Sequence, residues 1–136
     1  MAVCTFFGHR ECPENIMPDV KRTIINLYAN NNVTKFYVGN NGNFDSIVLR
    51  ALKDIRKDHP ELVFSVVLAY YPKENIADSI YPEGLETVPK KFCIDKRNLW
   101  MLNESDYVIT YIRRNTGGAA KYAEKAKKKN KTVINL

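Results

Sequence analysis

The sequence lacks long apolar runs, paired cysteines and low-complexity segments, and each absence excludes a class of protein. No segment approaches the roughly 20 apolar residues that a membrane-spanning helix needs, so we expect no membrane partner. The three cysteines form no CxxC pair and cannot all be joined in disulfides, which favours a reducing compartment. The first residues carry no basic leader followed by an apolar stretch and a cleavage site. Together these absences predict a cytoplasmic protein.

The apolar content is that of a folded domain. The chain has 136 residues, of which 45% are hydrophobic and 26% are charged. This length corresponds to about one domain, and the composition is far from that of a disordered chain. We therefore expect a single domain over residues 1–136.

Most of the positive charge lies in one segment near the end of the chain. The net charge is +6, and residues 121–131 hold six lysines and one glutamate. Surfaces that bind nucleic acids more often spread basic residues among aromatic ones. We therefore interpret this segment as the solvated face of a helix and do not expect nucleic acid as the main partner.

Strands and helices are predicted to alternate along the chain. Short runs of apolar, aromatic and β-branched residues predict strands at residues 3–7, 35–38, 64–69, 107–112 and 132–136. Apolar residues at helical spacing predict helices at residues 16–28, 44–55, 96–103 and from 118 onward. Residues 70–96 show no periodicity, and we expect them to form a long loop that acts as a lid or a binding loop.

This alternation predicts an α/β fold. We expect a Rossmann-like three-layer sandwich whose five-stranded parallel sheet has the order 3-2-1-4-5, with helices on both faces. In such a sheet the ligand site lies where the strand order reverses, beyond the carboxyl ends of the strands. Here that point is between the first and the fourth predicted strand.

Glycines and arginines gather at the predicted edge. Turns at residues 8–10, 39–45 and 113–118 follow three strands, and a helix beginning near Lys96 starts at the same edge. Glycine lets the backbone approach a phosphate, while amides at a helix start and guanidinium groups bind its oxygens. We therefore expect an anion-binding site formed by Gly8, His9, Arg10, Gly39, Asn41, Gly42, Phe44, Asp45, Arg97, Asn98, Thr116, Gly117 and Gly118.

Two of these residues have alternative roles that the sequence leaves open. Asp45 either accepts a ribose hydroxyl or caps a helix, and His9 is either structural or part of the site. The chain contains neither GxGxxG nor GxxxxGK[ST], which disfavours the common dinucleotide and P-loop sites. The cysteines have no metal-ligand spacing, so we expect no metal and no cofactor.

Several short motifs occur in an order typical of one superfamily. They are Phe6-Phe7-Gly8-His9-Arg10, Val38-Gly39-Asn40-Asn41-Gly42-Asn43-Phe44-Asp45, Arg97-Asn98-Leu99-Trp100-Met101, Ser105-Asp106, Thr116-Gly117-Gly118 and Val133-Ile134-Asn135-Leu136. Together they span nearly the whole chain. In this order they resemble the SLOG superfamily, the Rossmann-like domains that include the Lonely Guy phosphoribohydrolases and the DNA-processing protein A domain, and in particular its small bacterial branch of unassigned function.

The resemblance implies a nucleotide or nucleoside phosphate as the ligand. In the phosphoribohydrolases a PGGxGTxxE motif and an upstream arginine carry cleavage of the N-glycosidic bond, and Glu124 and Arg97 stand at the matching positions. Thr116 replaces the proline of that motif, and Ala120-Lys121 replaces its Gly-Thr pair. Glu124 is equally suited to an ion pair with the surrounding lysines.

Three functions follow from these observations. The leading hypothesis is a nucleotide-binding sensor or sequestering domain. The first alternative is an N-glycoside hydrolase or transferase acting on nucleoside phosphates, with Glu124, Asp45 and Arg97 as catalytic candidates. The second is a nucleic-acid-associated domain that uses the lysine-rich helix. The superfamily also implies a homodimer or a higher homo-oligomer.

Overall fold

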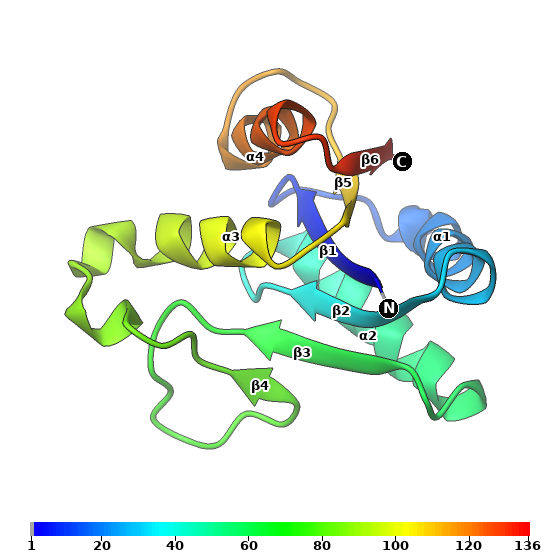
Figure 1. Ribbon diagram of the computed structural model, residues 1–136, viewed down its shortest axis with the longest axis horizontal. Helices are drawn as coiled ribbons and strands as arrows, with labels where there is room; N and C mark the ends of the chain where they lie inside the picture. Colours follow the sequence, from blue (N-terminus) through cyan, green and yellow to red (C-terminus); the bar gives the residue numbers. More distant parts are fainter. Residues whose placement is uncertain (1) are drawn as a thin grey trace.

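The computed structural model describes residues 2–136 and contains one parallel sheet. Its strands are β1 (Ala2–Gly8), β2 (Val33–Val38), β3 (Val63–Val67), β4 (Ser79–Ile80), β5 (Tyr107–Tyr111) and β6 (Thr132–Asn135). They lie in the order β4-β3-β2-β1-β5-β6, and every neighbouring pair is parallel. The order reverses between β1 and β5, as the alternation predicted (Figure 1).

Helices cover both faces of this sheet. Helices α1 (Met17–Asn30) and α2 (Asn43–Asp58) pack on one face, and α3 (Cys93–Asn103) and α4 (Gly118–Lys128) pack on the other (Figure 1). Three short 3-10 turns complete the chain: η1 (Glu14–Ile16), η2 (Leu85–Thr87) and η3 (Lys90–Phe92). The predicted three-layer Rossmann-like architecture is therefore confirmed.

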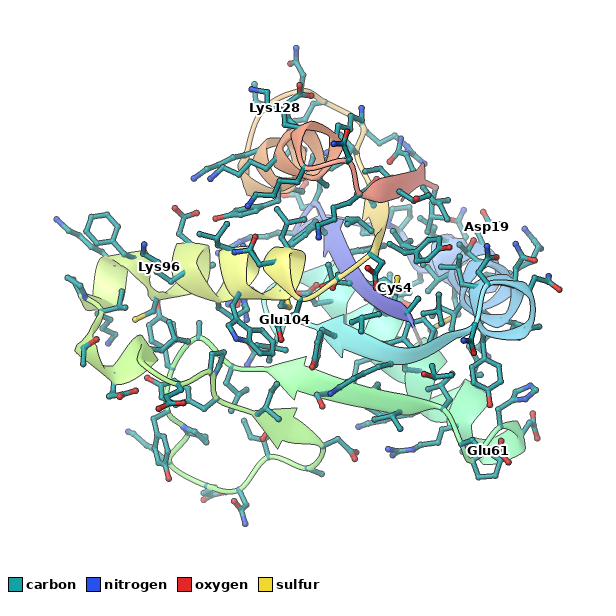
Figure 2. The ribbon with its side chains drawn as sticks, in the orientation of Figure 1. Cys4, Asp19, Glu61, Lys96, Glu104 and Lys128 are labelled. Atoms are coloured by element: carbon teal, nitrogen blue, oxygen red, sulfur yellow. The ribbon has the colours of Figure 1, made fainter. Side chains whose placement is uncertain are left out.

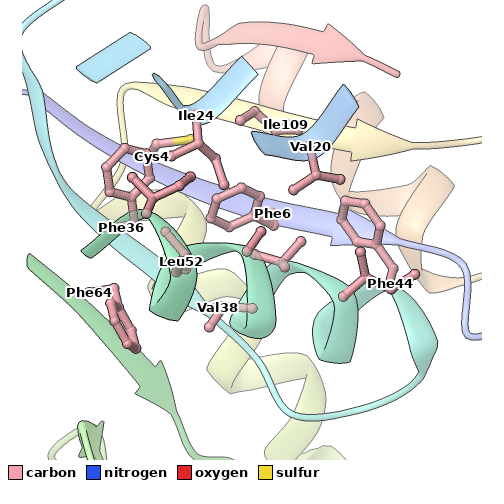
Figure 3. Packing of buried hydrophobic residues seen from close by; sticks show 14 of the residues in the cluster. Cys4, Phe6, Val20, Ile24, Phe36, Val38, Phe44, Leu52, Phe64 and Ile109 are labelled. Carbon is pink, nitrogen blue, oxygen red and sulfur yellow. The ribbon is translucent and has the colours of Figure 1, made fainter. Parts of the chain in front are cut away.

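The alternation of side chains along β1 divides the core into two layers. Phe6 belongs to the cluster with α1 and α2, whereas its neighbour Phe7 packs with Tyr122 of α4 on the opposite face. Figure 3 shows Phe6 in the larger cluster, with Val20 of α1 and Leu52 of α2. Successive strand residues point to opposite faces, so an apolar run without alternation is what a strand covered on both sides requires.

The sheet has six strands, whereas five were predicted. The extra strand, β4, is formed by two residues from the middle of the predicted loop. Val66 donates its amide hydrogen to Asp78 O (2.8 Å), and Arg56 of α2 forms two hydrogen bonds to the Asp78 carboxylate (3.0 and 3.2 Å). A strand of two residues has too few positions to show a period, so the sequence pattern did not predict it.

Residues 70–96 therefore do not form one continuous loop. They include β4, η2 and η3, and α3 begins at Cys93 rather than near Lys96. The turn at η2 is held by Thr87, whose hydroxyl donates to Gly84 O (2.7 Å). Among residues 2–136, no helix combines the length and the apolar character that crossing a membrane demands.

Candidate functional site

A cleft of about 610 Å³ opens at the carboxyl edge of the sheet, where the strand order reverses. The chain continues from β1 toward one face of the sheet and from β5 toward the other, so a space remains between the two connections. Its walls come from the end of β1, the turns after β1, β2 and β5, the first turns of α2 and α4, and one face of α3. The lining residues are Phe6, Phe7, Gly8, His9, Arg10, Glu11, Asn41, Asp45, Ile94, Arg97, Asn98, Met101, Arg114, Gly117, Gly118 and Ala119.

Two exposed arginines form part of the cleft's outer wall, which we call the rim. Arg10 follows β1 and Arg114 follows the neighbouring strand β5. Within residues 2–136, neither guanidinium group has a hydrogen-bond or ion-pair partner. Arg113 differs, because its guanidinium donates to Leu136 O (2.6 Å) and stacks on the Tyr111 ring at 4.1 Å. Of the two neighbouring arginines, Arg114 is therefore the one available to a ligand.

The start of α4 completes the rim. Gly117 precedes the helix with a φ of +92°, a conformation that favours glycine, and no side chain caps the helix. The first hydrogen bond of the helix runs from the amide of Lys121 to Gly117 O (3.1 Å). The three preceding amides, of Gly118, Ala119 and Ala120, therefore have no partner within the helix. These donors and the helix dipole favour an anion at this end of α4.

His9 joins the ends of β1 and β5. Its Nε2 accepts the amide hydrogen of Arg113 (2.9 Å), and the side chain is buried. Burial lowers the pKa of His9, and the positive charges of Arg114 and Arg113 lower it further. The ring is therefore neutral with its proton on Nδ1. His9 thus has a structural role and also lines the cleft.

Arg97 forms the floor of the cleft together with Asp45. Its side chain is only 1% exposed and donates four hydrogen bonds, to Oδ1 of Asn98 (2.9 Å), Oδ1 of Asn40 (3.2 Å), O of Val67 (2.8 Å) and Oδ1 of Asn41 (2.6 Å). All four acceptors are uncharged. Burial lowers the pKa of Arg97, and nearby Asp45 partly opposes this shift. The hydrogen bonds connect α3 to β3 and to the loop after β2.

Asp45 is the acidic member of the floor. It lies in the first turn of α2, and its Oδ2 accepts the amide hydrogen of Asn41 in the preceding loop (2.9 Å). Burial raises the pKa of Asp45 to about 6, although the Asn41 amide, Arg97 and Arg10 all favour the charged form. Asp45 is therefore not the N-cap of α2, which is Gly42, and its carboxylate lines the cleft.

Three of the predicted glycines are needed for close packing. A Cβ on Gly8 would lie 2.3 Å from the ring of Phe44, and one on Gly39 would lie 2.9 Å from Asp45 Oδ2 and 3.1 Å from Arg97 Cζ. Gly42 has a φ of +99° and sits against the Arg10 backbone. These glycines let the elements that carry the site approach one another.

The structure brings together most of the predicted site residues, but not all. Gly8, His9, Arg10, Asn41, Asp45, Arg97, Asn98, Gly117 and Gly118 line the cleft. Gly39, Gly42, Phe44 and Thr116 are not among its lining residues. Glu124 lines a different cleft, of about 790 Å³, between α4 and β6. Figure 2 shows that Lys128 of the same helix lies on the outer surface of the molecule.

Some residues of the cleft were not predicted. Glu11 and Arg114 adjoin predicted residues in the same turns, and that adjacency was the available signal. Asn40 holds Arg97 without lining the cleft itself. Ile94 and Met101 share a face of α3 with Arg97, and helical spacing alone does not distinguish a face that lines a cleft from one that packs only in the core.

Comparison with known proteins gives one clear result, which concerns the fold. No family model matches the chain, and no curated protein matches it. Among solved structures, the DNA processing protein A (DprA) from Streptococcus pneumoniae matches with a TM-score of 0.71 and 19% sequence identity. The fold is DprA-like. The match covers 99% of this chain and 50% of the DprA chain, so the chain spans about half the length of DprA. At this identity the likeness establishes the shared Rossmann-like fold.

Proposed function

We propose that this protein binds a nucleotide or nucleoside phosphate in the cleft at the carboxyl edge of the sheet, as a sensor or sequestering domain. One observation carries the proposal: the guanidinium groups of Arg10 and Arg114, which have no partner among residues 2–136, line the same cleft as the start of α4, which no side chain from those residues caps. Guanidinium groups and helix-start amides are the donors that phosphate oxygens prefer.

The cleft also has room and polarity for the rest of such a ligand. In this proposal the phosphate lies at the rim against Arg114 and the start of α4, and the sugar and base extend toward Asn98, Ile94 and Met101. A volume of about 610 Å³ is within the range of small-molecule sites, roughly 300–1,000 Å³. The DprA-like fold and the order of the short motifs support membership of the SLOG superfamily as part of the same proposal.

The alternative functions have weaker support. Of the two candidate acids of the hydrolase hypothesis, Asp45 lines the cleft that holds Arg97, whereas Glu124 lines the cleft between α4 and β6. The DNA processing named for DprA is a property of that protein, and none of the lysines of α4 is among the residues that line the cleft. We therefore propose binding without turnover. The free thiols Cys4, Cys12 and Cys93 support a cytoplasmic location, and a homodimer remains part of the proposal.

Isothermal titration calorimetry with a panel of nucleoside mono-, di- and triphosphates tests the proposal. We expect saturable binding of at least one member, weakened about tenfold or more in Arg114→Ala because a phosphate contact is lost. Arg113→Ala is the matched control, since its guanidinium is bonded to the Leu136 carbonyl, and it should retain the affinity. Absence of binding across the panel, or equal losses in both variants, contradicts the proposal.

A further inference from the structure

The floor of the cleft holds a buried cation and a carboxylate that is not bonded to it. Arg97 donates only to uncharged oxygens, and within residues 2–136 it takes part in no ion pair. Asp45 Oδ2 accepts the amide of Asn41 instead. Both side chains still lie within about 3 Å of the position that a Gly39 Cβ would take, at 3.1 and 2.9 Å. Asp45 is therefore the nearby countercharge of Arg97 without being its hydrogen-bond partner.

Cations face Asp45 from two other elements of the fold. Arg97 comes from α3 and Arg10 from the turn after β1, and both attract the carboxylate. From the loop that precedes its own helix, Asp45 receives the uncharged amide of Asn41. The other titratable groups among the lining residues are His9 and Glu11, which follow β1, and Arg114, which follows β5.

An anionic ligand in this cleft meets the same cations. Two negative groups that share one site cannot both keep their charge at low cost, and the carboxylate is the one able to take up a proton. We propose that an anionic ligand binds this cleft together with one proton from the solvent, which goes onto the Asp45 carboxylate. The protonated carboxyl then no longer repels the ligand, and the exposed guanidinium of Arg10 serves the bound anion. This inference rests on the proposed function and adds its regulation by pH.

The sign of the pH dependence follows from this coupling. Below a pH of about 6 the Asp45 carboxyl is already protonated, so binding needs no further proton. At higher pH each binding event takes up a proton, and the affinity falls by up to about tenfold per pH unit. If Asp45 instead accepted a hydroxyl of the ligand as a carboxylate, the affinity would rise with pH. The two roles therefore predict opposite slopes.

Inorganic sulfate is the probe for this experiment, because it keeps its double negative charge from about pH 5 to about pH 8, where a phosphate would titrate. Sulfate affinity is measured by NMR chemical-shift titration across that range. For the wild type we expect the affinity to fall as the pH rises. Asp45→Asn keeps an acceptor for the Asn41 amide but cannot be charged, so it should bind sulfate with little pH dependence and more tightly than wild type at about pH 8.

Two further variants separate Asp45 from the other titratable groups of the cleft. His9→Gln retains an acceptor for the Arg113 amide and removes the imidazole, and it should keep the wild-type slope. Glu11→Gln removes a negative charge from the same wall and should also keep that slope. A slope lost in His9→Gln, an unchanged slope in Asp45→Asn, or no sulfate binding at any pH overturns the inference. Nucleotide binding with no such slope would leave the proposed function standing.

Discussion

The floor and the rim of the cleft are built in opposite ways. On the floor, Arg97 is buried and all its contacts are internal, so its geometry is fixed before any ligand arrives. On the rim, Arg10 and Arg114 are exposed and without partners among residues 2–136. A group that is already satisfied stabilises the fold, whereas an unsatisfied exposed group is available to bind. We therefore expect that replacing the arginine of the floor lowers the stability of the fold, whereas replacing an arginine of the rim lowers the affinity for the ligand.

The largest effect is expected at the floor. Arg97→Met removes the donor for four acceptors, including the Val67 carbonyl and the Asn41 side chain, and should destabilise the fold by about 3 kcal/mol. Urea denaturation followed by circular dichroism measures this loss. Arg114→Ala is the rim control and should change stability by less than about 0.5 kcal/mol. Similar stabilities of the two variants would remove the distinction between floor and rim.

A smaller loss is expected where β1 meets α2. Gly8→Ala places a Cβ against the Phe44 ring, which is itself buried and stacked on Tyr111, and overpacking of this kind costs about 1–3 kcal/mol. Thermal unfolding should show a lower midpoint. Gly118→Ala is the matched control, because its added Cβ would meet nothing within 4 Å among residues 2–136 beyond its chain neighbours and the nearby backbone of its own helix. If Gly8→Ala is as stable as wild type, the approach of β1 to α2 does not depend on a glycine at this position.

An effect on the pH dependence of stability is expected from the charge of Asp45. Its pKa in the folded state, about 6, lies above its ordinary value, so the fold binds this proton more tightly than the unfolded chain does. The contribution of Asp45 to stability is therefore greatest below its ordinary pKa and declines as the pH rises through about 6. Asp45→Asn should remove this decline, which the thermal midpoints of both proteins at acid and neutral pH will show. Parallel curves for the two proteins would count against a protonated Asp45.

Much of this fold could be predicted from the sequence because its signals are local. Apolar runs and helical spacing located the five main strands and all four helices, and the right-handed crossover rule then gave the order of those strands. The edge of the sheet where Arg10 and Gly117 both lie followed from that order.

The unpredicted features depend on contacts between distant residues. β4 forms because Arg56 and Val66 bind Asp78, and no pattern within two residues can show this. The floor depends on Arg97 meeting oxygens from the loop after β2, and a single sequence carries no signal for that pairing. Tyr122 packs onto Phe7 and so fixes the rotation of α4 about its own axis. This rotation places Glu124 in the other cleft.

The central claim is that the turn after β1 and the start of α4 hold one anionic ligand, and amide chemical shifts measured by NMR during a titration with adenosine monophosphate test it most directly. The account predicts saturable shifts at Arg10, Arg114 and Gly118, with a common midpoint. Saturable shifts confined to the cleft between α4 and β6, around Glu124 and Val133, would contradict it.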